Sequence, residues 1–264
     1  MLSWIALAAL VAACQPAGLE GQGAAAGEPQ RLKVVTSGGF AAAYDILAPR
    51  FEAETGIELE TANGASSGGA ADSIPVRLER GEAFDVVILS RPSLDNLTEL
   101  GFVRAESRRD LVRSSIGMAV RKGAQVPDIG TPESFVHALL EAESIGYSAS
   151  ASGTYLSAVL FPRLGLAAAL QSKSKRILSE RVASVVARGE VEIGFQQISE
   201  ILPIEGIHFV GPIPDEYQSV TTFSIGITTR SDNVSGAQKL VDFLSSREAA
   251  ATIESTGLEP VSVQ

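Results

Sequence analysis

The chain has 264 residues, of which 45% are hydrophobic, 20% charged and 6% aromatic, as is usual for a soluble globular protein. Its formal net charge of −10 excludes sequence-independent binding to nucleic acids and a polybasic contact with a membrane, because both need many Lys and Arg residues. A negative overall field also repels anions mildly, so an anionic ligand would have to be held by local donors.

The first residues resemble a bacterial export signal. Residues 1–14, MLSWIALAALVAAC, form an almost uncharged apolar run that is too short to span a bilayer as a mature helix. The run ends in Val11-Ala12-Ala13-Cys14, which resembles a lipobox, and Cys14 is the only cysteine. We therefore expect a signal peptide and a periplasmic or extracytoplasmic protein lipidated at Cys14, with an ordinary cleaved signal as the alternative.

Residues 15–30 are rich in Gly, Ala and Pro and are predicted to form a flexible tether. Strand-like and helix-like segments alternate after it. We expect strands at 32–36, 57–61, 85–89, 116–120, 145–148, 191–196 and 221–228, and helices at 40–51, before 81, 92–100, 131–143, 153–164, 179–188 and 235–255. The continuous apolar run at 85–89 is typical of a strand buried on both faces of a parallel sheet. The alternation as a whole predicts an α/β fold.

Three loops that join a predicted strand to a predicted helix combine small hydroxyl residues with glycines. They are residues 36–39 (TSGG), 63–69 (NGASSGG) and 148–154 (SASASGT). Such loops lie beyond the carboxyl ends of strands, where free backbone N–H groups and the positive end of a helix dipole can hold an anion. One loop of this kind is usually an ordinary turn. Three together indicate a binding site for a small anion.

Residues 64–68 also match Gly-x-Ser-x-Gly, so a serine hydrolase with Ser66 as nucleophile is an alternative function. Its general base would have to be His137, inside a predicted helix, or His208, in a strand-like run, since the chain has no other histidine. Two distant histidines and one cysteine make no metal-ligand cluster, and P-loop and dinucleotide motifs are lacking. We expect no catalytic residue, no metal, no cofactor, and a protein that is not an enzyme.

From Leu32 to its C-terminus the chain resembles the molybdate-binding periplasmic proteins of ABC importers. The landmarks are the small-residue loops, residues 188–195 (RGEVEIGF) and, most specifically, residues 77–90 (RLERGEAFDVVILS). The resemblance implies a two-lobed type II periplasmic binding protein fold, each lobe a mixed, mostly parallel sheet flanked by helices. Lobe 1 would comprise residues 31–114 and 216–264, and lobe 2 residues 115–215, with the ligand held between them.

The resemblance also implies the residues that hold the ligand, since the family uses serine hydroxyls, backbone amides and a tyrosine. Gln197 stands at the tyrosine position, and its amide can serve an organic acid as readily as an ionised oxyanion. Arg181 is expected on a solvated helix face, whereas a buried arginine there would favour a carboxylate or phosphate. The expected ligand-binding residues are Ser37, Gly39, Ser66, Ser67, Ser152, Ser179 and Gln197.

The resemblance therefore predicts the substrate-binding protein of an ABC transporter. It would be a monomer that captures a small anion, either a molybdate-like oxyanion or a small organic acid, and presents it to a permease in the inner membrane. A ligand-sensing adaptor with the same fold is a further alternative. No nucleic-acid partner is expected.

Overall fold

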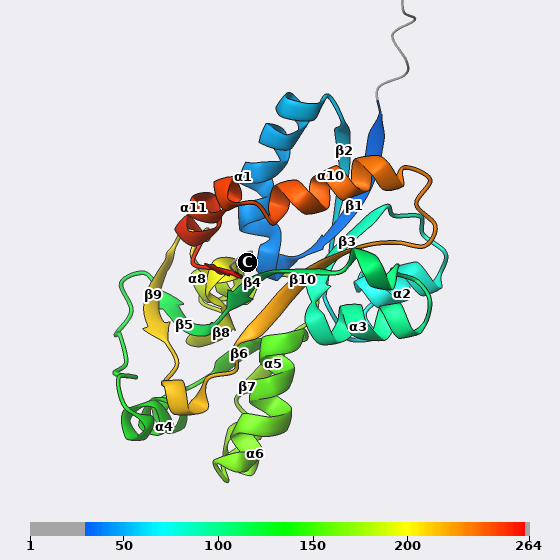
Figure 1. Ribbon diagram of the computed structural model, residues 1–264. Helices are drawn as coiled ribbons and strands as arrows, with labels where there is room; N and C mark the ends of the chain where they lie inside the picture. Colours follow the sequence, from blue (N-terminus) through cyan, green and yellow to red (C-terminus); the bar gives the residue numbers. More distant parts are fainter. Residues whose placement is uncertain (1–29, 262–264) are drawn as a thin grey trace, which may run out of the picture.

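The protein is described here by a computed structural model that covers residues 30–261. Two sheets, each flanked by helices, confirm the predicted two-lobed α/β fold (Figure 1). The predicted signal peptide, Cys14 and most of the tether lie outside the described residues. Among residues 30–261, no helix combines the length and the apolar character that crossing a membrane requires.

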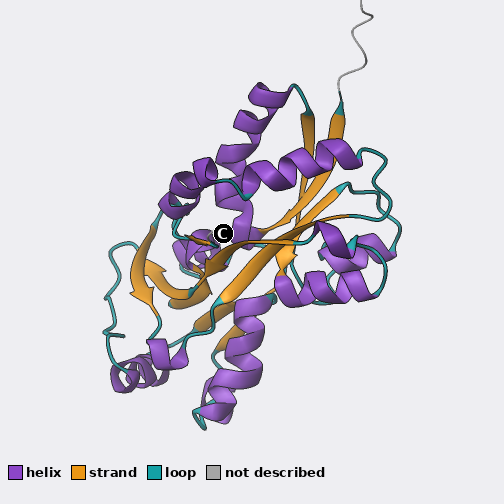
Figure 2. Cartoon of the chain, viewed as in Figure 1, coloured by secondary structure: helices purple, strands orange, loops and turns teal. Residues whose placement is uncertain are grey.

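The first sheet has the strand order β11-β4-β10-β3-β1-β2. Strand β1 pairs in parallel with β2 and with β3, whereas β10 is antiparallel to both β3 and β4. The strands are β1 (Arg31–Ser37), β2 (Glu58–Gly64), β3 (Val86–Ser90), β4 (Arg109–Ser114), β10 (Thr221–Ile227) and β11 (Glu259–Pro260). The helices around this sheet are α1 (Gly38–Thr55), α2 (Ile74–Glu79), α3 (Arg91–Glu99), α10 (Val234–Leu244) and α11 (Arg247–Ser255) (Figure 2).

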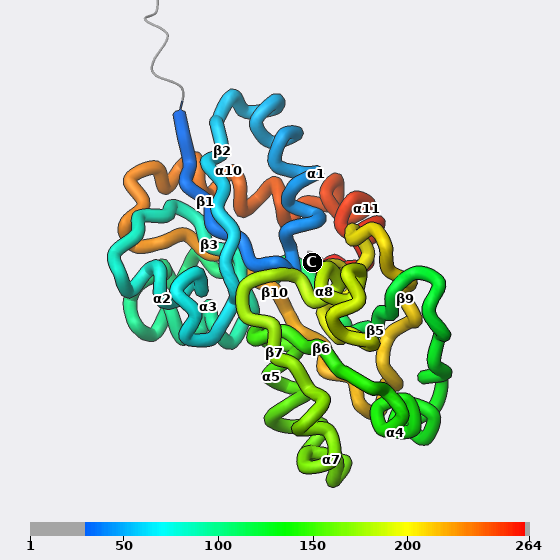
Figure 3. Tube along the Cα trace, turned by 180° about the vertical axis from the view of Figure 1, so that it is seen from behind, coloured from blue at the N-terminus to red at the C-terminus, as the bar shows by residue number. Residues whose placement is uncertain are grey.

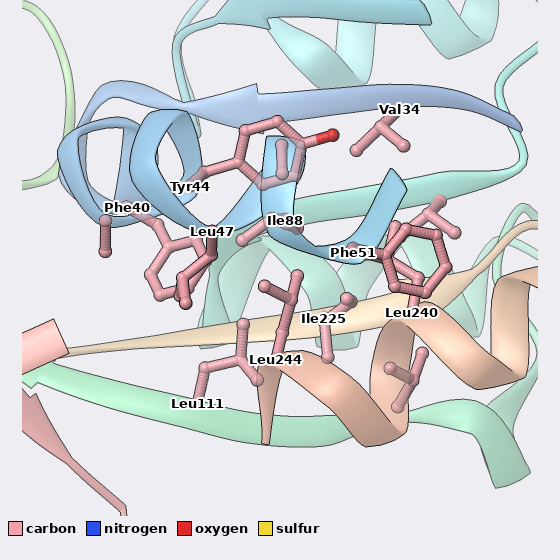
Figure 4. Packing of buried hydrophobic residues seen from close by; sticks show 14 of the residues in the cluster. Val34, Phe40, Tyr44, Leu47, Phe51, Ile88, Leu111, Ile225, Leu240 and Leu244 are labelled. Carbon is pink, nitrogen blue, oxygen red and sulfur yellow. The ribbon is translucent and has the colours of Figure 1, made fainter. Parts of the chain in front are cut away.

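Strand β3 is buried at each of its positions because helices cover both faces of the first sheet. Val86 and Ile88 belong to the apolar cluster that includes α1 and α10, and Val87 and Leu89 belong to the cluster with α2 and α3. Alternate side chains of a strand point to opposite faces, so a strand covered on both sides has to be apolar throughout. Figure 4 shows the first of these clusters, with Ile88 near side chains of α1 and α10.

The second sheet has the strand order β7-β6-β8-β5-β9, in which β6 pairs in parallel with β7 and β8, and β5 is antiparallel to β8 and β9. Its strands are β5 (Ile116–Arg121), β6 (Ile145–Ser148), β7 (Ser174–Ile177), β8 (Ile193–Gln197) and β9 (Ile207–Pro212). The helices of this part are α4 (Pro132–Glu141), α5 (Ala151–Tyr155), α6 (Phe161–Arg163), α7 (Ala167–Gln171), α8 (Val182–Ala187) and α9 (Ile198–Ile201).

The chain passes between the sheets twice. It leaves the first sheet at Ser115, between β4 and β5, and returns through residues 213–220, between β9 and β10. The side-chain amide of Gln218 joins the two passages, because it accepts from the Ile116 N–H at 2.8 Å and donates to the Ile116 carbonyl at 3.0 Å. Seen from behind, α1 lies beside the part of the second sheet's helices around α8 (Figure 3), and α9 contacts α1.

Two predicted helices differ from the structure. The stretch 235–255 forms two helices instead of one, because the chain breaks at Ser245 and Ser246, and the Ser246 hydroxyl caps α11 by accepting from the Ala249 N–H. The helix predicted from Ser179 begins only at Val182. This second difference matters for the site, because it places Arg181 at the helix N-terminus.

Candidate functional site

A cavity of about 370 Å³ lies between the two sheets. Its first wall comes from segments 37–41 and 63–66 and its second wall from segments 148–152, 177–181 and 196–200. The three hydroxyl-rich loops of the sequence therefore meet at one place, at the carboxyl ends of β1, β2 and β6. The volume suits a small organic acid or an oxyanion.

Six of the seven residues predicted to bind the ligand line this cavity, and the seventh, Ser67, does not. Ser179 is exposed at the rim, whereas the side chains from the strand ends are buried. Contact with a ligand stays a prediction for each of them. The six lining residues are Ser37, Gly39, Ser66, Ser152, Ser179 and Gln197.

Ser37, on the first wall, has a buried hydroxyl that makes no hydrogen bond with a described residue. It is the N-cap residue of α1, yet its side chain makes no capping hydrogen bond, and its buried Oγ has no partner among the described residues. A buried hydroxyl without a partner is costly unless something satisfies it. Because the free N–H groups at the start of α1 lie beside it, a ligand carboxylate or oxyanion at this helix end would do so.

Ser66 and Ser152, in contrast, already have partners inside the protein. Ser66 Oγ accepts from the Ser90 N–H at 3.0 Å, and the Oγ atoms of Ser148 and Ser152 lie 3.2 Å apart. Each hydroxyl can still offer one further interaction to a ligand. His137 and His208 are both exposed, and neither lines the described cavity, so Ser66 has no imidazole beside it as a hydrolase would need.

Gln197 lies at the base of the cavity and holds the two passages of the chain together. Its amide is 3.0 Å from Thr221 Oγ1 at the start of β10. With the amide oxygen turned to this hydroxyl, the nitrogen donates to Ser114 Oγ at 2.8 Å and to the Ser114 carbonyl at 3.1 Å. The polar atoms of Gln197 thus serve the connection between the lobes.

Two charged residues of the second wall were not foreseen. Arg181 was expected on a solvated helix face, but the structure places it partly buried on the cavity, because α8 starts one residue after it. Glu200 of α9 also lines the cavity and is partly buried. For Glu200 the sequence offers only the polar stretch QQISE, which comprises the last two residues of the buried strand β8 and the first three of α9.

The Glu200 carboxyl group lies against the N-terminus of α1. A Cβ atom at Gly38 would overlap Glu200 Oε1, so the absence of a side chain at Gly38 lets the two lobes meet here. Burial raises the pKa of Glu200 to about 7, although the charge of Arg181 and hydrogen bonds from the Gln196 side chain and the Gln197 N–H lower it. A carboxyl group with this pKa can both accept and return a proton near neutral pH.

Neighbouring residues fix the positions of Glu200 and Arg181. Ser199 Oγ donates to the Gly39 carbonyl at 2.8 Å, a buried hydrogen bond that joins α9 to α1. Gln196 Oε1 accepts from the Val182 N–H at 2.8 Å and so holds the start of α8. Segment 196–200 therefore contacts both lobes around the cavity.

The remaining carboxyl groups of the cavity are engaged or exposed. Glu180 accepts two hydrogen bonds from the Arg188 guanidinium, at 2.9 and 3.0 Å, and Asp72 is exposed. Within residues 30–261 there is no group of three or more His, Cys, Asp or Glu side chains that could hold a metal ion.

Solved structures of binding proteins share this fold. The periplasmic molybdate-binding protein of Azotobacter vinelandii superposes with a TM-score of 0.70 and 22% identity over 88% of this chain and 100% of that one. The sulfate-binding protein SubI from Mycobacterium tuberculosis has a TM-score of 0.69 and 19% identity over 88% of this chain and 87% of its own. Identities this low show the fold alone.

A curated relative corrects the expectation that the chain is not an enzyme. An aconitate isomerase from Pseudomonas sp. is 43% identical over 233 residues, which are 88% of this chain and 89% of that protein. That relative carries the name of an enzyme, so the expectation was wrong. The expectation rested on the absence of a nucleophile–base pair and of a metal-ligand cluster from the sequence, and enzymes can also work by general acid–base catalysis without either.

A family model described as "Bacterial extracellular solute-binding protein" matches residues 32–259. This match covers nearly the whole described chain and confirms the resemblance to periplasmic binding proteins. It also supports a location outside the cytoplasm. The chain belongs to the family of bacterial extracellular solute-binding proteins.

Proposed function

We propose that this protein is an isomerase of a small unsaturated polycarboxylate, with aconitate as the substrate, built on a solute-binding fold. The observation that carries the proposal is the presence of Arg181 and Glu200 together in the cleft between the lobes. Arg181 is a fixed cation that suits a carboxylate, and Glu200 is a carboxyl group with a pKa of about 7. The 43% identical relative named aconitate isomerase supports the same conclusion.

The cleft offers donors that suit the three carboxylates of aconitate, a propene tricarboxylate. The Arg181 guanidinium can bind one carboxylate with two parallel hydrogen bonds. A second carboxylate fits the start of α1, where the Ser37 hydroxyl has no partner among the described residues. The hydroxyls of Ser66 and Ser152 lie on opposite walls and are available to the third.

Arg181 is also what distinguishes this cleft from the one implied by the resemblance to molybdate-binding proteins, which hold their oxyanion with neutral donors. A guanidinium matches the planar fork of a carboxylate. The substrate proposed here is therefore an organic acid, one of the two ligand classes expected from the sequence.

The transport role expected from the sequence is a second candidate, and membership of the solute-binding family supports it. In that role a monomer would deliver a small organic anion to an ABC permease. For either role we propose that the protein acts outside the cytoplasm, anchored through Cys14, with lobe boundaries at residues 114–115 and 215–216.

The test starts with purified protein and cis-aconitate, followed by proton NMR. We expect trans-aconitate to appear until the two isomers reach equilibrium. A thermal-unfolding panel would compare molybdate, sulfate and tricarballylate, the saturated analogue that has the same three carboxylates but no double bond. Tricarballylate at about 100 times its Kd should stabilise the fold by about 2.7 kcal/mol. A shift with molybdate alone, and no isomerisation, would overturn the proposal.

A further inference from the structure

Isomerising a carbon–carbon double bond requires that its π bond be broken for a time. In aconitate a methylene group lies next to the double bond and carries a carboxylate, so its C–H bond is unusually acidic. When a base removes this proton, the C–H electron pair forms a new π bond to the central carbon. The old π pair then takes the proton at the opposite carbon. The atoms and electrons balance without a co-reactant, and the product is again aconitate, with a geometry set by the bound conformation.

This route needs one group that accepts a proton and returns it. The acidic residues that line the described cavity are Asp72, Glu180 and Glu200. Asp72 is exposed to solvent, and Glu180 is held by the Arg188 guanidinium. Glu200 is partly buried and makes no salt bridge with another described residue. Of the three, it is therefore the carboxyl group that is partly withdrawn from solvent and also has no ion pair with a described residue.

The position of Glu200 also suits the reaction. Its Oε1 lies where the Cβ atom of residue 38 would be, beside the start of α1. A substrate carboxylate held by Ser37 and the N–H groups of α1 would bring the carbon that bears it close to this oxygen.

The charge that acts on Glu200 comes from one neighbouring element. Glu200 faces uncharged groups of α1, at Gly38, and of β8, at Gln196 and Gln197. Arg181, at the start of α8, is the nearby cation whose charge acts on it. This cation would also stabilise the negative charge that develops on the substrate once the proton has left.

We propose that Glu200 is the catalytic base of this site and that it carries the proton from one terminal carbon of the substrate backbone to the other. The inference rests on the proposed function, because it assigns a residue to the isomerisation. Burial, which keeps the pKa of Glu200 near 7, supports it: the group is basic enough to take the proton and acidic enough to give it back.

The experiment compares wild type with Glu200→Gln and with Glu205→Gln, which removes an exposed carboxyl group from the same lobe. In D₂O, wild type should place deuterium on the terminal backbone carbons of aconitate in the fraction of turnovers in which the protonated Glu200 exchanges with solvent before it returns the proton. We expect Glu200→Gln to lower kcat and deuterium incorporation by about 10³-fold, within the range for general acid–base catalysis. Its affinity for tricarballylate should stay within about threefold of wild type, and Glu205→Gln should behave as wild type.

A further variant, Glu200→Asp, keeps a carboxyl group in nearly the same place. It should restore measurable turnover, and kcat/KM should rise with pH through an inflection, as in wild type, where the ligand-free pKa of Glu200 places the inflection at about 7. Wild type that does not isomerise aconitate would overturn the proposed function. Active wild type with an equally active Glu200→Gln would overturn the assignment of Glu200 alone. Loss of tricarballylate binding in Glu200→Gln would also overturn it, in favour of a role in binding.

Discussion

The two walls of the cleft differ in chemistry. The first wall, around Ser37, Gly39 and Ser66, presents hydroxyls and backbone N–H groups at the start of α1. The second wall adds a guanidinium, Arg181, and a partly buried carboxyl group, Glu200. The first wall is what a solute-binding protein needs to hold an anion. On the proposed function, the difference teaches that proton transfer in an anion-binding cleft needs only a cation and a partly buried acid on one wall.

If the second wall holds a buried acid, Glu200 should make the folded protein less stable as pH rises. Its pKa is raised from 4.5 to about 7, so the folded state keeps a proton that the unfolded state releases, and stability falls between those pH values. A shift of this size corresponds to roughly 3 kcal/mol. We therefore compare the free energy of unfolding of Glu200→Gln with that of wild type in denaturant at pH 4 and at pH 8. The difference in favour of the variant should be roughly 2–3 kcal/mol larger at pH 8 than at pH 4. An equal difference at both pH values would show that the pKa of Glu200 is not raised in the folded protein.

A substitution at Gly38 tests whether the two walls have to fit together. The methyl group of Gly38→Ala would displace the Glu200 carboxyl group, and a misplacement of about 1 Å can cost about 100-fold in rate. We expect kcat to fall by about 10–100-fold with little loss of tricarballylate binding. Gly69→Ala is the matched control, since a Cβ atom there would meet nothing within 4 Å. Unchanged kcat in Gly38→Ala would show that the walls act independently.

Arg181 should contribute affinity that no residue of the first wall can replace. A hydrogen bond to a charged group is worth about 1.5–3 kcal/mol, so Arg181→Gln should weaken tricarballylate binding by about 10–150-fold in calorimetric titration. The pKa of Glu200 should also rise further, because the charge of Arg181 lowers it. Arg121→Gln, which removes an exposed arginine outside the cavity, is the control. Equal binding by both variants would place the carboxylate elsewhere.

The two serines of the first wall should respond differently. Ser37→Ala removes a buried hydroxyl that has no partner among the described residues, so affinity should fall by about 2–10-fold while the free energy of unfolding of the ligand-free protein rises slightly. Ser66→Ala leaves the buried Ser90 N–H without its acceptor and should lower the free energy of unfolding by about 1 kcal/mol. Ligand titration and urea unfolding of both variants measure these effects. A loss of stability in Ser37→Ala would mean that its hydroxyl has a structural partner.

The first wall was largely predictable from the sequence. Strand β3 is apolar at successive positions because both faces of its sheet are covered, and the loops rich in Ser and Gly follow strands, where ligands bind in α/β folds. These signals are local and indicate the loops that contain Ser37, Gly39 and Ser66, whereas the choice of these residues as ligand contacts followed from the family resemblance. The predicted contact of each with a ligand is still to be tested.

The predicted residues Ser152, Ser179 and Gln197 line the second wall, but its two charged residues were not predictable in the same way. Helix α9 has four residues, too few for an apolar period, so Glu200 carries no sign of its burial. Its surroundings depend on α1, as the hydrogen bond between Ser199 and Gly39 shows, which joins residues 160 positions apart. Arg181 was placed in solvent because the start of α8 was predicted too early. Both charges acquire their environment only when the lobes come together.

Segment 196–200 ties the connection between the lobes to the chemistry proposed here. Gln197 bonds to both passages of the chain, and Glu200, three residues later, meets Gly38 of the other lobe. Any rotation of one lobe against the other therefore changes the distance between this carboxyl group and the start of α1. On the proposed mechanism, an open molecule would hold an anion on one wall without reacting with it. In a transport protein the angle between the lobes governs how long the ligand stays bound. Here the same angle would decide whether Glu200 is close enough to the substrate for proton transfer.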